Sequence, residues 1–495
     1  MKRYLLSLAV IICLSIMLLT LLAGCTGKSP SQTTAATTTV ASSTANATKV
    51  YINNREIIFS ESGATDLDLL SVENKIKISA EIKSGDSVKI NGEELTDALT
   101  LDYSSIKRED TISVTLLKDG AEKTYTVNLM PSTFGDYTVD GESKTPGDYY
   151  ITTYDEAVNY IFKLNPKGEL IFYKKTGQNA LDFRKEYNSK GEVRYTYLQY
   201  LDGLFCGIQG INPGCVVIMD ENYNVIEEVY YTDSEGNSIK IDPHGFIYLD
   251  DGHYILTAYK DVVVKDLPEG FYAPDNSAYL AVLYIEEIKN GEILWEFCST
   301  DYYDILVSTT VVDWRKGLDQ CYDYVHFNAM DIDTDGNLIV SCRNINSILK
   351  LSRKDGKLIW ILGGKKDKFG LTEEQEFSKQ HSIILTEDGS YMLFNNNNDK
   401  VMISKAEHST VIRLKIDEEN MCVTEFRQVE AGYYSSYMGA IRELDAEKRI
   451  YLWTVGGGTD VPEYSVVEYS ETDGAIFKFR FENGYRRIYC ANKCE

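Results

Sequence analysis

The sequence predicts an all-β protein in which a small β-sandwich precedes a six-bladed β-propeller. A phrase that combines a turn with a strand recurs at a regular interval through most of the chain, which is typical of propellers. The composition also favours strands, because the chain has 36 Tyr and 35 Gly but only 9 Pro. Ahead of the repeats, a shorter region alternates apolar and polar residues with period two, which indicates a separate β domain.

The overall composition and net charge limit the classes of function that the protein can have. The chain has 495 residues, of which 43% are hydrophobic and 25% are charged, so it is globular. With 75 acidic against 50 basic residues, the formal net charge is −25. Such a surface repels polyanions, so we expect no nucleic-acid partner. An anionic substrate would need a local cationic pocket.

The N-terminus has the features of an export signal, which we assign to residues 1–24. Two basic residues are followed by an apolar stretch as far as Ala23, and the sequence Leu-Ala-Gly-Cys ends at Cys25. The alternative is a membrane-spanning anchor, since about 20 apolar residues can cross a bilayer. Because Leu-Ala-Gly-Cys resembles the bacterial lipobox, we expect Cys25 to carry a lipid. The protein would then be an extracytoplasmic lipoprotein anchored to the cell membrane.

Residues 25–49 predict a flexible tether between this anchor and the folded body. They are rich in Thr, Ser and Ala and have almost nothing to bury. Residues 50–131 then predict the β-sandwich, and they contain neither His nor Cys. We therefore expect a spacer or docking role for this domain. Its alternating segments are KIKISAEI (75–82), DSVKING (86–92), DTISVTLL (110–117) and KTYTVNLM (123–130).

The propeller is assigned to residues 132–495 from six copies of one hairpin phrase, in which a turn with Asn, Asp or Gly precedes a β-rich segment. Successive copies are 54 to 67 residues apart. A second hairpin phrase comes before or between them, so each repeat should hold four strands. A lectin-like or jelly-roll array is the alternative. The marker residues of the six copies are Gly168, Asn224, Gly291, Gly356, Asn420 and Gly474.

Cysteine usage leaves the disulfide connectivity open. The chain has 10 Cys, and two of them lie in or at the end of the signal. Disulfides are possible outside the cytoplasm. Cys206 with Cys215 and Cys490 with Cys494 are close enough in sequence to be plausible pairs.

Histidine is the first candidate for chemistry, because the chain has only 5 His and three of them share a position in the repeat. His244, His326 and His381 each stand just before a predicted hairpin, and they are separated by 82 and 55 residues. Equivalent positions in successive blades converge on the propeller axis, so these side chains should meet at the central channel. Each alone could be an ordinary surface or core histidine. His253 is expected to be a strand or loop residue, and His408 to be solvated.

Arg343 and Asn328 add candidate ligands for an oxyanion. Arg343 stands in a strand phrase, IVSCRNIN, where burial without an anionic partner is costly, although a surface position is the alternative. Asn328 follows His326 by two residues, so in an extended segment both point to one face. Together the three offer convergent hydrogen-bond donors for a tetrahedral oxyanion.

These residues lie in segments that closely resemble the bacterial aryl-sulfate sulfotransferase family. The shared order is H-x-N, S-x-R, G-K-x-x-W-x-L-G-G and Q-H, carried here by HFNAMDIDTDGNLIVSCRN, DGKLIWILGG and FSKQHSIIL, and DPHGFIYLDDGHYIL matches an earlier histidine segment. The resemblance covers about residues 135–480 and implies an N-terminal β-sandwich as well. It also implies sulfuryl transfer from a phenolic sulfate to a phenolic acceptor, without a cofactor or metal.

The resemblance assigns a role to each site residue. His381 would be the nucleophile that is transiently sulfated, in a ping-pong mechanism. His326, Asn328 and Arg343 would bind the sulfate, and His244 would act as acid and base. The family also uses a late hydroxyl residue, for which Thr459 is a weak match because this part of the chain departs from the pattern.

Two other functions are compatible with the same residues. His244, His326 and His381 could hold a metal ion in a propeller hydrolase or lyase, although a guanidinium beside a divalent cation would be repulsive. A surface propeller could also bind a ligand or partner without catalysis. The sequence leaves open the natural donor and acceptor and whether the protein is a homodimer.

Overall fold

The computed structural model describes residues 47–67, 75–154, 158–203, 212–233, 235–267, 271–398, 408–457, 463–482 and 488–495, all within one compact unit. The expected signal, Cys25, most of the expected tether, Cys206 and Thr459 lie outside the described residues. None of the described helices is sufficiently long and apolar to span a bilayer.

The region after the expected tether forms two antiparallel-rich sheets that share an apolar core. Strand β4 alternates exposed and buried side chains, and its Ile76 and Ile78 share one apolar cluster with Val88 and Val114 of the other sheet. This is the period-two pattern of a sheet with one face in a core. One sheet is β2 (Arg55–Glu56), β1 (Lys49–Ile52), β4 (Lys75–Glu81) and β7 (Leu99–Asp102), and the other is β3 (Ala64–Asp66), β9 (Ala121–Asn128), β8 (Thr111–Lys118), β5 (Ser87–Ile90) and β6 (Glu93–Glu94).

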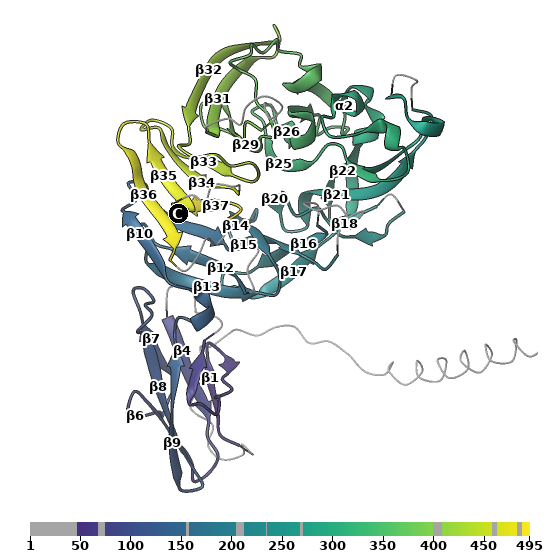
Figure 1. Cartoon of the computed structure of the whole chain (residues 1–495). Helices are drawn as coiled ribbons and strands as arrows, with labels where there is room; N and C mark the ends of the chain where they lie inside the picture. Colours follow the sequence, from purple (N-terminus) through teal and green to yellow (C-terminus); the bar gives the residue numbers. More distant parts are fainter. Residues whose placement is uncertain are drawn as a thin grey trace, which may run out of the picture. The chain divides into compact units, whose positions relative to one another are not determined.

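The remainder of the described chain is organised in six larger sheets, which follow one another around a common centre (Figure 1). Their strands are β11 (Asp148–Thr152), β12 (Asn159–Leu164) and β13 (Leu170–Thr176); β14 (Ala180–Tyr187), β15 (Val193–Tyr200), β16 (Gly214–Met219) and β17 (Val225–Val229); β20 (Ile247–Asp250), β21 (His253–Val264), β22 (Ala278–Lys289) and β23 (Glu292–Cys298); β25 (Phe327–Ile332), β26 (Leu338–Cys342), β27 (Ser347–Leu351) and β28 (Leu358–Leu362); β29 (His381–Leu385), β30 (Tyr391–Asn395), β31 (Thr410–Asp417) and β32 (Cys422–Glu430); and β33 (Ala440–Asp445), β34 (Ile450–Thr454), β35 (Val466–Ser470) and β36 (Gly474–Phe481).

Strands from the two ends of this region complete the first and last of these sheets. The C-terminal β37 (Ala491–Cys494) pairs with β11, and β10 (Tyr137–Gly141) pairs with β36. The last part of the chain is thereby hydrogen-bonded to the first, with β37 and β10 as the end strands of their sheets. Other elements are β24 (Cys321–Asp323), parallel to β22, the hairpin β18 (Tyr231–Thr232) with β19 (Ser238–Ile239), α2 (Tyr303–Ser308), and 3-10 turns at Ser132–Phe134, Pro274–Asn276, Ser299–Asp301, Trp314–Lys316, Arg343–Ile345 and Gly364–Lys366.

The marker residues of the sequence repeat all fall in or at the end of a turn between two paired strands, for example Gly356 between β27 and β28. The other turns are β12–β13, β16–β17, β22–β23, β31–β32 and β35–β36. Gly356 has φ of 69°, and a Cβ there would lie 2.7 Å from the Glu296 carbonyl oxygen. Only glycine fits this turn without strain. The regular interval in the sequence is therefore the interval between equivalent hairpins.

Buried ion pairs connect neighbouring sheets. The Lys350 ammonium on β27 lies 2.8 Å from carboxylates of both Asp333 and Asp335, and its side chain is only 1% exposed. Glu418 of the next sheet completes this cluster and also accepts a hydrogen bond from Trp360. The Lys350 ammonium and the Asp333 carboxylate are buried, whereas Asp335 and Glu418 are partly exposed. Lys350 without its carboxylates would be an uncompensated buried charge, so its contact with Glu418 resists separation of the two sheets.

We expect Lys350→Ala to destabilise the protein by about 3–5 kcal/mol, because it leaves the buried Asp333 carboxylate without its cation. Thermal unfolding followed by circular dichroism measures this change. The exposed neighbour Lys354 provides the matched control, for which Lys354→Ala should have no measurable effect. Equal melting temperatures for both variants would show that the Lys350 cluster does not connect the sheets.

Candidate active site

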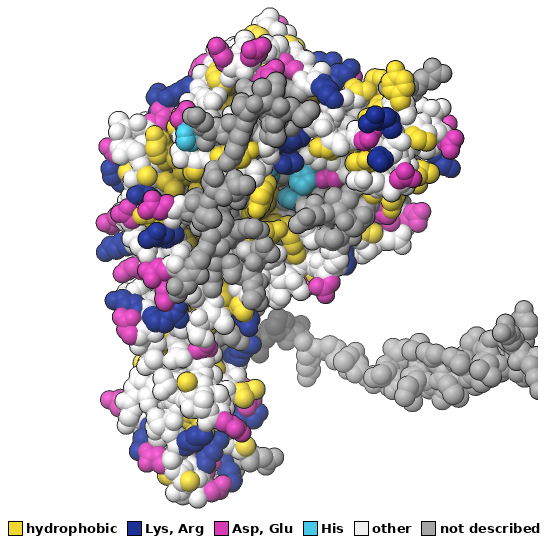
Figure 2. Space-filling model, in the orientation of Figure 1, with side chains coloured by type: hydrophobic (Ala, Val, Ile, Leu, Met, Phe, Trp, Pro, Cys, Tyr) yellow, Lys and Arg dark blue, Asp and Glu magenta, His cyan; other side chains and the backbone are white. Residues whose placement is uncertain are grey.

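Three of the predicted histidines lie at the same end of the inner strands, where the chain enters a sheet. His244 precedes β20, His326 immediately precedes β25, and His381 is the first residue of β29. In Figure 2, histidine side chains are visible in the middle of the face that the sheets form, beside basic and acidic side chains. Histidines at the same position of the sequence repeat therefore lie at the same end of the inner strands.

His244 and His326 are in direct contact, and each is oriented by its own aspartate. Their ring centroids are 5.1 Å apart in an edge-to-face arrangement. Nδ1 of His244 lies 2.7 Å from Oδ1 of Asp242, and Nδ1 of His326 contacts Oδ2 of Asp323. Because a carboxylate only accepts, each Nδ1 carries hydrogen and each Nε2 faces away from its aspartate. The two aspartates thus fix the tautomer and direction of both rings.

The two histidines nevertheless have opposite tendencies to take up a proton. Burial opposes protonation of His244, but the charge and hydrogen bond of Asp242 outweigh it and raise the pKa of His244. For His326, burial together with the positive charges of His244 and Arg343 lowers the pKa despite Asp323. A pair of adjacent groups with pKa values pushed apart is suited to hold one proton between them, and here His244 is the member that takes up a proton more readily.

His381 is held as a neutral imidazole with Nδ1 protonated. Its Nδ1 lies 2.6 Å from Oδ1 of Asn396 and 3.0 Å from the Lys379 carbonyl oxygen, both of which only accept. Its Nε2 accepts a hydrogen bond of 3.3 Å from the backbone N–H of Met438. The lone pair of Nε2, which is the nucleophilic electron pair of this tautomer, is therefore on the side away from Asn396.

The environment of His381 also keeps it unprotonated. The side chain is 4% exposed, and burial lowers its pKa well below the usual value. The positive charges of Arg343, His326 and His244 lower that pKa further. The charges of the other three groups thus act together with burial to keep the His381 imidazole neutral.

Asn328 and Arg343 lie beside these rings, but their hydrogen bonds differ in part from the expected convergence of donors. The Asn328 amide donates to the Gln380 carbonyl oxygen at 2.6 Å, while its buried Oδ1 has no hydrogen-bond partner among the described residues. Arg343 donates from its backbone to the His326 carbonyl oxygen at 2.8 Å and from Nη1 to Oδ1 of Asn344 at 3.0 Å. One of the two Asn328 side-chain N–H groups is thus already hydrogen-bonded to the residue before His381, which leaves the other N–H group as a donor for a substrate.

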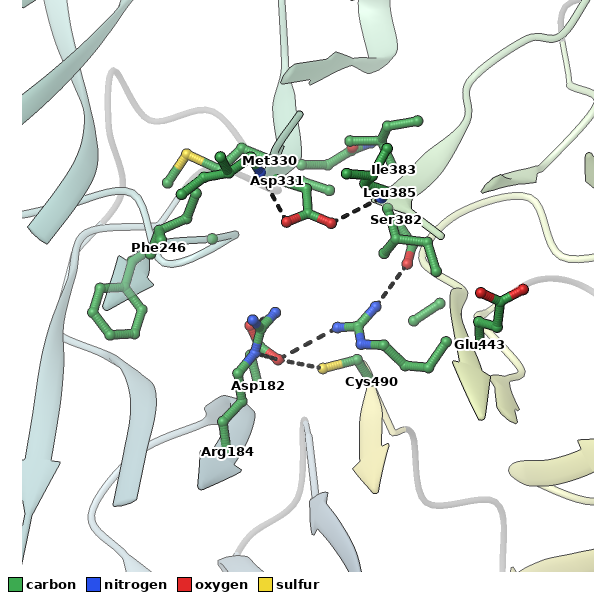
Figure 3. A pocket seen from close by; sticks show the side chains of 18 of the residues that line it. Asp182, Arg184, Phe246, Met330, Asp331, Ser382, Ile383, Leu385, Glu443 and Cys490 are labelled. Carbon is green, nitrogen blue, oxygen red and sulfur yellow. Dashed lines mark hydrogen bonds and ion pairs between the residues drawn. The ribbon is translucent and has the colours of Figure 1, made fainter. Parts of the chain in front are cut away.

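A cavity of about 450 Å³ lies along the inner strands, with His244 and Asn328 among its lining residues. Figure 3 shows Asp182 and Arg184 on one side of this cavity and Asp331 on the other, with Ser382 and Cys490 nearby. Asp331 is half-buried, and its carboxylate accepts hydrogen bonds from the backbone N–H groups of Ile332 and Leu385. Burial raises the pKa of Asp331.

Several sequence-based expectations need correction or fall outside the described residues. Cys490 and Cys494 are separate thiols, because Cys490 faces Asp182, to which its Sγ donates at 3.2 Å. His408 is half-buried rather than solvated. His253 begins β21, as expected of a strand residue, and pairs with Glu287 at 2.8 Å. Thr459 lies outside the described residues.

The sequence reasoning missed the residues that orient the three imidazoles, namely Asp242, Asp323, Asn396 and the backbone of Met438. A signal existed for the two aspartates, which precede His244 and His326 by two and three residues. No comparable signal marked Asn396, one of four consecutive asparagines, or a backbone amide 57 residues from His381.

Comparison with known proteins identifies the family. The sequence model of the family described as Arylsulfotransferase (ASST) matches residues 198–481, more than half of the chain and the segment that carries all three histidines. The chain belongs to this arylsulfotransferase family. No curated protein matches it.

Solved structures that resemble the chain do so only distantly. A protein of unknown function from Bacteroides caccae has 10% identity and a TM-score of 0.38, covering 70% of this chain and 94% of that one. A streptogramin B lyase has 11% identity and a TM-score of 0.35, with 70% and 88% covered. The periplasmic gluconolactonase of Pseudomonas aeruginosa has 9% identity and a TM-score of 0.32, with 70% and 99% covered. Such low TM-scores carry no argument about function.

We expect Arg343→Gln to raise the pKa of His381, because the substitution removes a positive charge that disfavours the imidazolium. Titration of the protein labelled with ¹⁵N-histidine measures this pKa directly, and the small number of histidines keeps the spectrum simple. Arg353→Gln is the control, since Arg353 is a partly buried guanidinium paired with Glu287 in another sheet. An unchanged His381 pKa in Arg343→Gln would contradict the electrostatic coupling.

Proposed function

We propose that this protein is an aryl-sulfate sulfotransferase that transfers a sulfuryl group from a phenolic sulfate ester to a phenolic acceptor, through a sulfated His381. The observation that carries the proposal is the state of His381: a neutral imidazole with its Nδ1–H tied to Asn396, close to the charge of Arg343. A neutral imidazole is a nucleophile, and a nearby guanidinium attracts the sulfate group that it would attack.

In the first half-reaction, Nε2 of His381 attacks the sulfur atom of the bound aryl sulfate. An N–S bond forms, the S–O bond to the aryl oxygen breaks, and the electron pair leaves with the phenolate. The sulfuryl oxygens keep their negative charge throughout, so Arg343 and His326 act by positioning and by electrostatic stabilisation, as in phosphoryl transfer. Nε2 must give up its hydrogen bond from Met438, whose N–H can then donate to a sulfuryl oxygen.

His244 is the proposed acid and base. Its raised pKa supplies a proton for the departing phenolate, and Asp242 stabilises the imidazolium. In the second half-reaction the acceptor phenol returns a proton to His244 while its oxygen attacks the sulfur atom of sulfohistidine, which restores neutral His381. Protons and electron pairs therefore balance over the two steps, as a ping-pong mechanism requires.

The proposal extends to the architecture and location of the protein. We interpret the six large sheets as the blades of one six-bladed propeller over residues 132–495, supported by the pairing of β37 with β11. Residues 50–131 would be a β-sandwich, supported by the core that its two sheets share. Residues 1–24 and 25–49 remain a proposed lipoprotein signal and tether, with Cys25 lipidated and the catalytic body outside the cytoplasm.

The geometry does not favour a three-histidine metal site. Among the described residues, His244, His326 and His381 do not form a group whose ligand atoms lie close together, and the described carboxylates that do, Asp333, Asp335 and Glu418, surround the Lys350 ammonium. Each imidazole is instead oriented by its own side-chain acceptor. This pattern suits three separate roles in group transfer better than shared coordination of one ion.

We expect the purified protein to release 4-nitrophenol from 4-nitrophenyl sulfate faster when phenol is present, because phenol removes the sulfuryl group from His381 and regenerates the nucleophile. The absorbance of 4-nitrophenolate measures release, and chromatography identifies phenyl sulfate as the second product. Release that is independent of phenol, with inorganic sulfate as the product, would assign the protein as a sulfatase. Absence of any release would favour a binding role.

His244→Gln should slow transfer most for donors with poor leaving groups, because these depend on proton donation to the departing oxygen. We expect a loss of about 10²–10⁴ with phenyl sulfate, within the range of general acid catalysis, and a smaller loss with 4-nitrophenyl sulfate. Single-turnover rates over a series of substituted phenyl sulfates measure this dependence. Equal losses for all donors would mean that His244 does not protonate the leaving group.

A further inference from the structure

The residue after the proposed nucleophile has an unusual backbone conformation. Ser382 has φ of 59°, in the left-handed region that a residue with a Cβ seldom adopts. The register of β29 against β30 shifts between His381 and Ile384, so Ser382 belongs to a β-bulge. Bulges redirect the neighbouring side chains of a strand. The direction of the His381 imidazole therefore depends on what holds Ser382 in this conformation.

The Ser382 hydroxyl is held by the neighbouring strand β33 and uses its full hydrogen-bonding capacity. Oγ donates to the Ile441 carbonyl oxygen at 3.2 Å and accepts from the Ile441 N–H at 3.0 Å. It accepts a third bond of 3.0 Å from Nη1 of Arg442. A hydroxyl has one donor and two acceptor positions, so these three contacts fix its place completely.

Arg442 is in turn held by residues of two other sheets. Its Nε donates to Oδ1 of Asn492 at 2.7 Å, and its Nη2 lies 3.5 Å from Oδ1 of Asp182. Asp182 is 5% exposed and also accepts from Arg184 at 2.8 Å and from Asn492 at 2.9 Å. The group thus joins β14, β29, β33 and β37, which belong to four different sheets.

The same stretch of chain that holds Ser382 also contacts His381 itself. Met438, two residues before β33, donates its N–H to Nε2 of His381, while Ile441 binds the Ser382 hydroxyl. Both contacts reach β29 from residues 438–442. The imidazole is therefore held at Nε2 and at the following residue by one segment, which is anchored through Arg442.

We infer that Ser382 and Arg442 form a positioning latch that aims His381 at the sulfur atom of the substrate. The latch contacts neither of the residues proposed to bind the sulfate, Arg343 and His326, in the bonds described above. Its loss should therefore slow attack by His381 and leave substrate binding almost unchanged. The expected effect on the rate of sulfuryl transfer rests on the proposed function. The expected effect on the position of the His381 imidazole does not.

The test compares Ser382→Ala with Ser382→Gly, because a β-branched replacement such as Thr would be strained at a φ of 59°. We expect Ser382→Ala to lower the single-turnover rate of 4-nitrophenol release by about 10–100-fold with a KM for the donor within about threefold, since small errors in the position of a reacting group cost this much. Ser382→Gly adopts the left-handed conformation without strain but lacks the hydroxyl, so it should lose as much rate as Ser382→Ala. Arg442→Gln should resemble Ser382→Ala. Arg353→Gln, which breaks a guanidinium–carboxylate pair elsewhere, is the control for general destabilisation and should keep the wild-type rate.

A ¹⁵N-histidine spectrum provides a readout that does not depend on activity. Wild-type His381 should show the Nδ1–H tautomer with a hydrogen-bonded Nε2, and Ser382→Ala should shift the Nε2 resonance as the bond to Met438 is lost. A wild-type Nε2 resonance in Ser382→Ala, or a wild-type rate in Ser382→Gly, would overturn the inference. If the wild-type protein transfers no sulfuryl group but the Nε2 resonance still responds, the proposed function fails while the latch stands.

Discussion

The site depends on a buried imidazole that stays neutral next to cationic groups. His381 is almost fully buried, and a charged imidazolium there would lose its hydration and face the charges of Arg343 and His244. The same setting favours the addition of an anionic sulfuryl group, because the adduct carries negative charge toward Arg343. Neutrality of the nucleophile and attraction of the substrate thus arise from one electrostatic arrangement, in a protein whose net charge is −25.

The fold supplies this arrangement through irregularities at the entrance of the inner strands. The register of β14 shifts around Asp182, that of β25 around Asn328, and that of β29 around Ser382. Asp182, His326 and Ser382 all have left-handed backbone conformations, each of which costs of order 1–3 kcal/mol unless its surroundings enforce it. The regular parts of the sheets, together with the Lys350 cluster, stabilise the fold. This stability offsets the cost of the left-handed conformations at the centre.

The sequence was informative where the structure is periodic. The repeated hairpin phrase located the turns of the large sheets. The common phase of His244, His326 and His381 predicted that their side chains would meet at the centre, and the rings of His244 and His326 are in contact. It was less informative where the chain departs from periodicity. The conformation of residues 378–382 and 435–439 follows from positive φ angles and from contacts with other sheets, so the roles of Asn396, Met438 and Ser382 could not be derived from spacing. Likewise, sequence spacing left the pairing of Cys490 with Cys494 open, and in the structure both are free thiols, with Cys490 facing Asp182.

The most direct measurement is the location of the sulfuryl group on the protein during turnover. After brief incubation with 4-nitrophenyl sulfate and no acceptor, peptides prepared at alkaline pH can be mapped by mass spectrometry. The mechanism predicts one sulfated histidine, at residue 381, which disappears when phenol is added and is absent from His381→Ala. A sulfuryl group on another residue, or rapid transfer by a protein that never acquires one, would contradict the central role of this imidazole.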